Sequence, residues 1–277
     1  MCTSKPDIPT GQEPVWLNRQ EGYCCTMAVW TEVKLCLGLL TRLPVDSKHD
    51  EPAADVSAAC KWFPVIGVMI GALSGAALFI GDILELPDSV SALLAISAVI
   101  ILTGAMHEDG LADVADGFGG GRDKKHKLEI MRDSRLGVYG TIALILDVAF
   151  RWALITQLLS FGWIFATACL IASGASSRLV VISLMKSLTA ARQDGLGASA
   201  GIPDNNSILI AILFTVIALL LTKDTLLFLS IAISVPIAAG LLHYLANNQI
   251  GGQTGDVLGA GQRLGEVLAL TSMVVVA

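Results

Sequence analysis

Two long stretches of this chain contain no charged residue. Residues 62–81 form an uncharged run of twenty, and residues 90–106 form another of seventeen. About twenty apolar residues in a helix, each rising 1.5 Å, cross the ~30 Å hydrocarbon core of a bilayer. Neither run shows the polar and apolar alternation of an outer-membrane barrel, and an open strand would leave backbone groups unpaired in lipid. The chain is therefore predicted to be all-α, a polytopic integral membrane helix bundle.

The composition supports the same class. Of the 277 residues, 54% are hydrophobic and only 15% are charged, whereas a soluble domain is about a quarter charged. About seven transmembrane helices are predicted, at residues 62–81, 89–106, 136–159, 162–185, 207–222, 225–244 and 256–277. The apolar piece at 27–43 contains Glu32, Lys34 and Arg42, so an interfacial or re-entrant helix is at least as compatible with it as a full crossing.

The rest of the chain adds no second domain. Residues 1–25 lack the apolar core of a signal peptide and are predicted to be a disordered lead, which leaves 26–277 as a single transmembrane catalytic domain. The six cysteines show neither metal-ligand spacing nor a compact disulfide framework, so reduced thiols are expected. The net charge of -6 argues against nucleic acid as a partner. The sequence leaves the oligomeric state, including a homo-oligomer, open.

Basic residues indicate the orientation in the membrane. Six lysines and arginines lie between Met106 and Leu136, whereas the connection from Gly81 to Asp88 contains three acids and no base. Cytoplasmic loops are enriched in Lys and Arg. Alternation then places 43–61, 107–135, 186–206 and 245–255 on the cytoplasmic side of the cytoplasmic (inner) membrane, and these are also segments with dense polar residues.

The segment after the second apolar run is strongly acidic. It contains His107, Glu108, Asp109, Asp113 and Asp116 within ten residues. On a helix the three aspartates are spaced i, i+4 and i+7, so their carboxylates share one stripe and repel one another unless a cation lies there. Oxygen ligands at an aqueous interface suit Mg²⁺, with Mn²⁺ as an alternative. A solvated acidic loop, paired with the following lysines and arginines, is the plainer alternative.

The residues that follow favour phosphate chemistry. Glycines at positions 110, 117 and 119–121 permit close backbone approach to a ligand, and Arg122 comes directly after them. In "RDSRLGVYG", Asp133 is a further candidate metal ligand, and Arg132 or Arg135 can neutralise an anionic substrate beside Tyr139. Together these features predict a metal-assisted phosphoryl-transfer site.

Charges also lie within the predicted spans, where they usually line a cavity. Asp147 and Arg151 are spaced i, i+4 and are expected to pair on one helix, chiefly in a structural role. Arg178 is expected to face the site from the end of the next span. Polar residues around Asp256 enter the last span and predict a hydrophilic cavity shared with the acidic segment.

Five segments resemble one known family in their order along the chain. They are "TRLPV", "WFPVIGVMIG", "HEDGLADVADGFGGG", "IMRDSRLGVYG" and "GGQTGDVLGA", from Thr41 to Ala260. They resemble the cobalamin synthases, adenosylcobinamide-GDP ribazoletransferases of vitamin B12 synthesis. The resemblance implies a Mg²⁺-dependent membrane transferase that joins adenosylcobinamide-GDP to α-ribazole or its 5'-phosphate in nucleotide-loop assembly and releases GMP.

The resemblance also implies roles for the candidate residues. Catalysis would consist chiefly of charge neutralisation and alignment. The metal ligands would come from Glu108, Asp109, Asp113, Asp116 and Asp133. The catalytic residues would be Asp113, Asp116 and Asp133, and either Asp116 or Asp133 would take the hydroxyl proton. The substrate-binding candidates are His107, Arg122, Arg132, Arg135, Tyr139, Arg178 and Asp256.

Two other functions compete with this interpretation. Asp113, Asp116 and Gly117 match the start of the CDP-alcohol phosphotransferase pattern, but residues 118–121 replace its Ala–Arg and its later acids are missing. A membrane carrier would use Asp147, Arg151 and Arg178, yet carriers place their sites near the midplane between repeats. No repeat is visible here, and the acids gather at one surface.

Overall fold

The computed structural model describes residues 29–45 and 55–277, so the predicted disordered lead at 1–25 lies outside the described residues. The described part is helical, as predicted, and its only β-type contact is one isolated bridge between Ala190 and Gln253. Residues 29–40 form a first helix. The other elements are α2 (Val56–Ala59), η1 (Cys60–Trp62), α3 (Phe63–Ile83), α4 (Asp88–Thr103), α5 (Met106–Gly120), α6 (Lys124–Ile130), α7 (Val138–Leu159), α8 (Trp163–Ser187), α9 (Leu196–Ser199), α10 (Asn205–Leu219), η2 (Leu220–Thr222), α11 (Thr225–Ile250) and α12 (Gly255–Val276).

Among the described residues, five helical segments are long and apolar enough to cross a membrane. They are Val56–Ile83, Val138–Leu159, Trp163–Ser187, Asn205–Thr222 and Thr225–Ile250. They correspond to the predicted spans 62–81, 136–159, 162–185, 207–222 and 225–244. The pair α4 and α5, bent by 88°, adds a sixth only if the two helices count together as one broken span, because α4 alone, at the predicted span 89–106, has 16 residues. The predicted number of about seven is therefore not confirmed, because α12 at the predicted span 256–277 contains three charged residues and is not among these segments.

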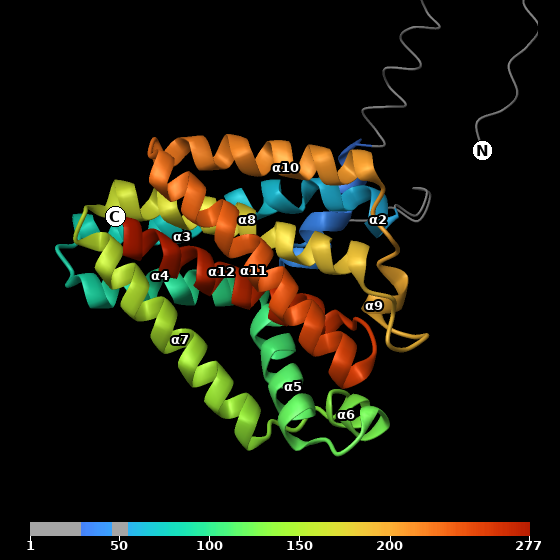
Figure 1. Cartoon of the computed structure of the whole chain (residues 1–277). Helices are drawn as coiled ribbons and strands as arrows, with labels where there is room; N and C mark the ends of the chain where they lie inside the picture. Colours follow the sequence, from blue (N-terminus) through green and yellow to red (C-terminus); the bar gives the residue numbers. More distant parts are fainter. Residues whose placement is uncertain (1–28, 46–54) are drawn as a thin grey trace, which may run out of the picture.

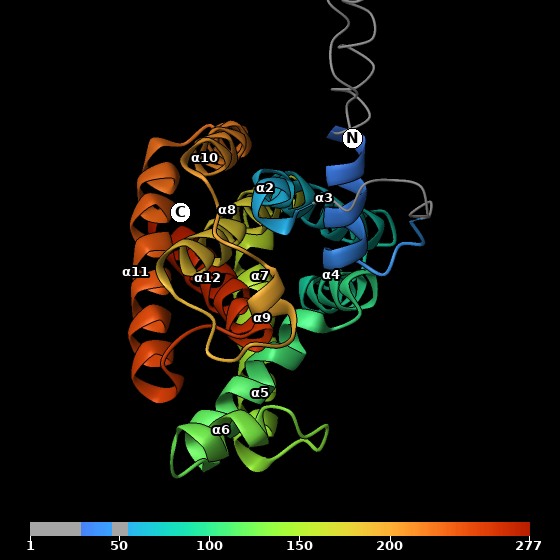
Figure 2. The same cartoon turned by 90° about the vertical axis from the view of Figure 1, so that its right-hand side faces the viewer.

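The helix at residues 29–40 is short in its described part. Its twelve residues rise about 18 Å, less than the ~30 Å hydrocarbon core. It is held against η1, just before α3, by Glu32, which accepts hydrogen bonds from Lys61 Nζ at 3.0 Å and Trp62 Nε1 at 2.9 Å. Figure 2 shows this helix beside α3 and α4, with α10 and α11 on the opposite flank of the bundle.

Helices α3 and α8 run side by side through the middle of the bundle (Figure 1) and pack at very short distance. A Cβ built on Gly67 would lie 2.2 Å from the Gly174 carbonyl oxygen, and one on Gly71 would lie 2.5 Å from the Leu170 carbonyl oxygen. Backbone contacts this short require glycine. The small residues Gly67, Gly71 and Gly75, spaced four apart along α3, therefore serve helix packing.

Replacing Gly71 by Ala is expected to destabilise the protein by about 1–3 kcal/mol, because the new Cβ meets backbone atoms that cannot rotate away. Thermal unfolding in detergent measures the effect. The matched control is Gly240→Ala on α11, where no atom lies within 4 Å of the added Cβ. Equal melting temperatures for the two variants would contradict the packing argument.

Two consecutive left-handed residues produce the bend between α4 and α5. Gly104 has φ 64° and Ala105 has φ 58°, and α5 starts at the next residue. In Figure 1, α5 extends away from the horizontal helices toward α6 at the bottom. It packs against α12 and α7. The acidic helix is thus directed away from the axis of α4 instead of continuing it.

The loop that follows α8 and the loop that precedes α12 are joined through backbone hydrogen bonds. Ala191 N donates to Gln253 O, and Gln253 N donates to Thr189 O, both at 2.8 Å. This bridge ties the segment after α8 to the segment before α12. Arg192 and Asp256 are consequently brought to the same edge of the molecule.

Candidate functional site

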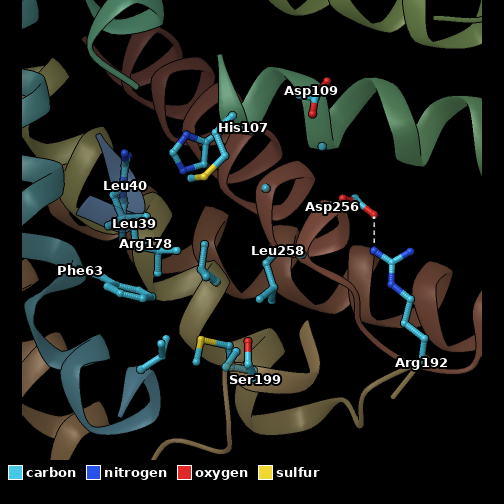
Figure 3. Close-up of a pocket in the computed structure, with 18 residues that line it drawn as sticks. Leu39, Leu40, Phe63, His107, Asp109, Arg178, Arg192, Ser199, Asp256 and Leu258 are labelled. Atoms are coloured by element: carbon cyan, nitrogen blue, oxygen red, sulfur yellow. Dashed lines mark hydrogen bonds and ion pairs between the residues drawn. The ribbon is translucent and has the colours of Figure 1, made fainter. Parts of the chain in front are cut away.

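A cavity of about 240 Å³ lies where the first helix, α3, α5, α8 and α12 meet (Figure 3). Its polar wall includes His107, Asp109, Arg178, Arg192 and Asp256. Its apolar wall is formed by Leu39, Leu40, Val56, Phe63, Met106, Val181, Met185 and Leu258. The cavity therefore offers charged groups of both signs beside a hydrocarbon surface, a combination typical of small-molecule sites.

The acidic stripe predicted from the sequence lies on α5. Asp109 is exposed at the cavity and Asp113 is half-buried one turn further along. The charges that act on Asp113 are those of Asp109, Asp256 and Asp116, and Arg192 opposes them. Within the described part of the chain, neither the Asp109 nor the Asp113 carboxylate has a hydrogen bond or an ion pair. Like charges held together without cationic contacts favour the approach of a cation.

Asp116, the third acid of the stripe, is engaged with the backbone. Its Oδ2 accepts from Gly137 N at 2.7 Å and its Oδ1 accepts from Gly140 N at 2.9 Å. These amides belong to the start of α7, where intrahelical acceptors are absent. A Cβ on Gly137 or Gly140 would lie 2.4 Å from this carboxylate. Asp116 therefore caps α7 and fixes the angle between α5 and α7.

Asp256 and Arg192 form the edge of the cavity opposite Arg178. Asp256 Oδ2 lies 3.5 Å from Arg192 Nη2, the contact dashed in Figure 3, and it also accepts from Thr254 Oγ1 at 3.1 Å. The Nη1 of Arg192 is buried and has no hydrogen-bond partner among the described residues. Asp256 was predicted from the sequence, whereas Arg192 was not, because its isolated position in a polar loop gives no periodic pattern.

A second cluster of charges is buried between α5, α7 and α12. Arg151 Nη2 lies 2.6 Å from Asp147 Oδ2 and 3.1 Å from Glu108 Oε1. Arg263 Nη2 lies 3.3 Å from Asp147 Oδ1, and its Nη1 lies 2.9 Å from Glu266 Oε2. The predicted pair of Asp147 and Arg151 is thus present, but it is part of a larger network that includes Glu108.

Arg263 and Glu266 are the members of this network that the sequence analysis did not single out as a pair. The signal was available, because charges at i and i+3 on a predicted span can pair on one face. Glu108 was predicted as a metal ligand. In the structure its Oε1 is committed to the two arginines, whereas its Oε2 is buried without a hydrogen-bond partner among the described residues.

Arg178 is a fully buried cation on the cavity wall, with 2% of its surface exposed. Its Nη1 donates to Gly174 O at 3.0 Å and to Ser177 Oγ at 3.1 Å. No carboxylate of the described residues lies within ion-pair distance, and its Nε has no partner there. Arg178 thus lies on the wall of the cavity, and its role in substrate binding stays a prediction.

The remaining sequence candidates lie around this centre. His107 is buried on the cavity wall. Arg132 pairs with Asp194, and Arg135 pairs with Asp133 at the surface. The Arg135 guanidinium holds the pKa of the Asp133 carboxyl below its usual range, which makes that carboxylate a weaker base. Arg122 is exposed at the end of α5, and the exposed Tyr139 ring packs over Gly119.

The acidic side chains can hold a metal ion together with substrate and water, but they cannot fill its coordination shell by themselves. Across residues 29–45 and 55–277, no three His, Cys, Asp or Glu side chains converge closely enough to hold an ion by themselves. Mg²⁺ commonly takes one or two carboxylates and completes its shell with water and substrate phosphates. Asp109 and Asp113, one helical turn apart and otherwise unpaired, fit that requirement.

The chain is similar to known proteins over most of its length. Residues 32–274 match the family described as Cobalamin-5-phosphate synthase. An adenosylcobinamide-GDP ribazoletransferase of Bradyrhizobium diazoefficiens is 42% identical over 245 residues, which cover 87% of this chain and 92% of the relative. One of Azorhizobium caulinodans is 40% identical over 258 residues (90% and 97%), and one of Shewanella baltica is 36% identical over 245 residues (87% and 93%). No solved structure matches.

Proposed function

Because the chain belongs to the cobalamin-5-phosphate synthase family, we propose that it transfers the adenosylcobinamide phosphate of adenosylcobinamide-GDP to α-ribazole or α-ribazole 5'-phosphate. GMP is the leaving product. The protein is a transferase of cobalamin synthesis with membrane helices. We place its site on the cytoplasmic face of the inner membrane, where the basic loops of the sequence predict it. The observation that carries the proposal is the pair of unpaired carboxylates beside two cavity-lining arginines.

The chemistry requires one bond to form and one to break. A ribose hydroxyl of the acceptor attacks the phosphorus that bears cobinamide, and the bond from that phosphorus to the bridging pyrophosphate oxygen breaks. GMP leaves with this oxygen. In such transfers the protein contributes mainly alignment and charge neutralisation. A bound Mg²⁺ would supply neutralisation of the pyrophosphate charge and would be held by Asp109 and Asp113.

The side chains around the cavity divide the remaining tasks. Arg192, with one buried nitrogen free of described partners, binds the pyrophosphate of the donor. Asp256 is the other carboxylate on the cavity wall, and it accepts the hydroxyl proton. Asp116 orients α5 through its two amide contacts and thereby keeps Asp109 at the cavity edge, with Asp113 one turn further along.

Turnover by the full-length protein in liposomes is expected to need both substrates and Mg²⁺. GMP release from adenosylcobinamide-GDP should follow addition of α-ribazole 5'-phosphate, stop with EDTA and return with excess Mg²⁺ or Mn²⁺. CDP-diacylglycerol with an alcohol serves as the control donor and should not react. Absence of GMP release with either acceptor would reject the reaction, whereas release that persists in EDTA would reject only the metal.

A further inference from the structure

The cavity has two chemically different ends. Asp109, Asp256 and Arg192 lie at one end, and Arg178 lies at the other beside the apolar wall (Figure 3). Its volume of about 240 Å³ is below the ~300–1,000 Å³ of pockets that enclose whole drug-sized ligands. It is therefore too small for a corrinoid macrocycle with its nucleotide. It suits a smaller molecule, or part of one, that combines an apolar ring with an anionic group.

Arg178 can bind an anion, and no carboxylate of the described residues occupies that position. It is buried in the wall of the cavity, without a contacting carboxylate in the described part of the chain. Burying a cation without a partner is costly, and protein sites that do so usually bind a counter-charge. The nearest acids act on it only from a distance, because Glu266 and Glu108 pair with Arg263 and Arg151.

A chain of hydrogen bonds holds Arg178 in this orientation. Ser177 Oγ accepts from Arg178 Nη1 and also from Gln262 Nε2, which lies 3.2 Å away. Gln262 Nε2 in turn lies 2.6 Å from Glu266 Oε2. One side of the guanidinium is thereby fixed, while Nε and Nη2 make no hydrogen bond with the residues described here. The N–H groups of Nε and Nη2, which point in nearly parallel directions, are suited to binding an oxyanion.

The apolar wall beside Arg178 can bind the ring of a ligand whose anionic group binds Arg178. Phe63 is only 2% exposed, and Figure 3 shows its ring beneath the Arg178 side chain. Leu40 and Met185 belong to the same wall. A flat, weakly polar bicyclic base gains free energy by leaving water for such a surface. A nucleoside monophosphate with an apolar base presents this ring and an anionic phosphate on one ribose.

Resting on the proposed function, we infer that this cavity is the subsite of the nucleoside acceptor and that Arg178 selects its 5'-phosphorylated form. The base packs against Phe63, Leu40 and Met185, and the phosphate accepts hydrogen bonds from Arg178. The attacking ribose hydroxyl then faces Asp109 and Asp256 at the other end. Arg178 thus determines acceptor specificity and takes no part in bond breaking.

The test compares two acceptors in the Arg178→Gln variant. With adenosylcobinamide-GDP saturating, kcat/KM for α-ribazole 5'-phosphate is expected to fall about 10- to 100-fold, the value of a charge-assisted hydrogen bond. The value for α-ribazole should change less than about threefold, and Arg178→Lys should restore part of the preference. The control is Lys125→Gln, an exposed cation of α6, with 89% of its side chain accessible. Equal losses for both acceptors, or a raised KM for adenosylcobinamide-GDP alone, would overturn the inference.

A second variant decides the matter if Arg178→Gln does not fold. Ser177→Ala keeps the arginine and removes one of the groups that hold it, so the preference for the phosphorylated acceptor should fall severalfold. An unchanged preference in a folded Ser177→Ala protein would contradict the assignment. Wild-type turnover is measured in the same series, so failure of the reaction itself is distinguishable from failure of the acceptor assignment.

Discussion

Replacement of Asp113 by Asn is expected to lower kcat by about 10²–10³-fold with both substrates saturating. The carboxylate is half-buried, is unpaired among the described residues and faces Asp109 across one helical turn. An amide of the same size keeps the packing but removes the charge that attracts Mg²⁺. Metal assistance contributes several kcal/mol to a transition state, and each ~1.4 kcal/mol corresponds to tenfold in rate. The rate of GMP release in liposomes measures the change.

The control for Asp113→Asn is Glu129→Gln on α6, which removes an exposed acid whose carboxylate lies 3.8 Å from Lys125 Nζ. Its rate should match that of the wild type. Melting temperatures in detergent establish that both variants fold. If folded Asp113→Asn releases GMP at nearly the wild-type rate, Asp113 does not bind the metal. Partial recovery at high Mg²⁺ would instead be expected if the variant only weakens metal affinity.

Replacement of Arg263 by Met is expected to destabilise the protein by about 3–5 kcal/mol. Arg263 is 1% exposed and contacts both Asp147 and Glu266. Its removal leaves two buried carboxylates short of positive charge, and breaking a buried ion pair on one side carries a penalty of this size. Thermal unfolding in detergent shows whether the variant is less stable than the wild type and whether it loses more stability than the control variants.

Two comparisons make the result on Arg263 specific. Lys125→Met removes a surface ion pair, and its stability should stay within about 0.5 kcal/mol of the wild type. The double variant Arg263→Met with Glu266→Gln removes one charge of each sign and should recover part of the loss. A single Arg263→Met variant as stable as the wild type would show that the network does not hold α7 and α12 together.

Local patterns along the sequence predicted much of the fold. Uncharged runs located α3, and spacing placed Asp109, Asp113 and Asp116 on one helix. Each of these inferences depends on residues within a few turns of one another. Such short-range information survives in a single sequence because helical periodicity fixes which residues share a face.

Long-range contacts were the part that could not be predicted. Nothing near Asp116 indicates that its carboxylate binds amides twenty-one and twenty-four residues away. Arg263 meets Asp147 only because α12 crosses α7. The bend at Ala105 depends on a left-handed conformation that alanine seldom adopts, so no propensity points to it. Tertiary packing decides all three.

The buried charge network also constrains how the protein is assembled in its membrane. Asp147 and Arg151 lie on one helix and can enter lipid already neutralised by each other. Glu108 also pairs with Arg151 on α7, whereas Arg178 is linked through Ser177 and Gln262 to Glu266 on α12. The ribosome delivers α12 after all the other helices described here. Until α12 packs against them, the earlier helices lack the Arg263 contact to Asp147 and the Gln262 link between Ser177 and Glu266, so we expect the network to close only when α12 joins the bundle.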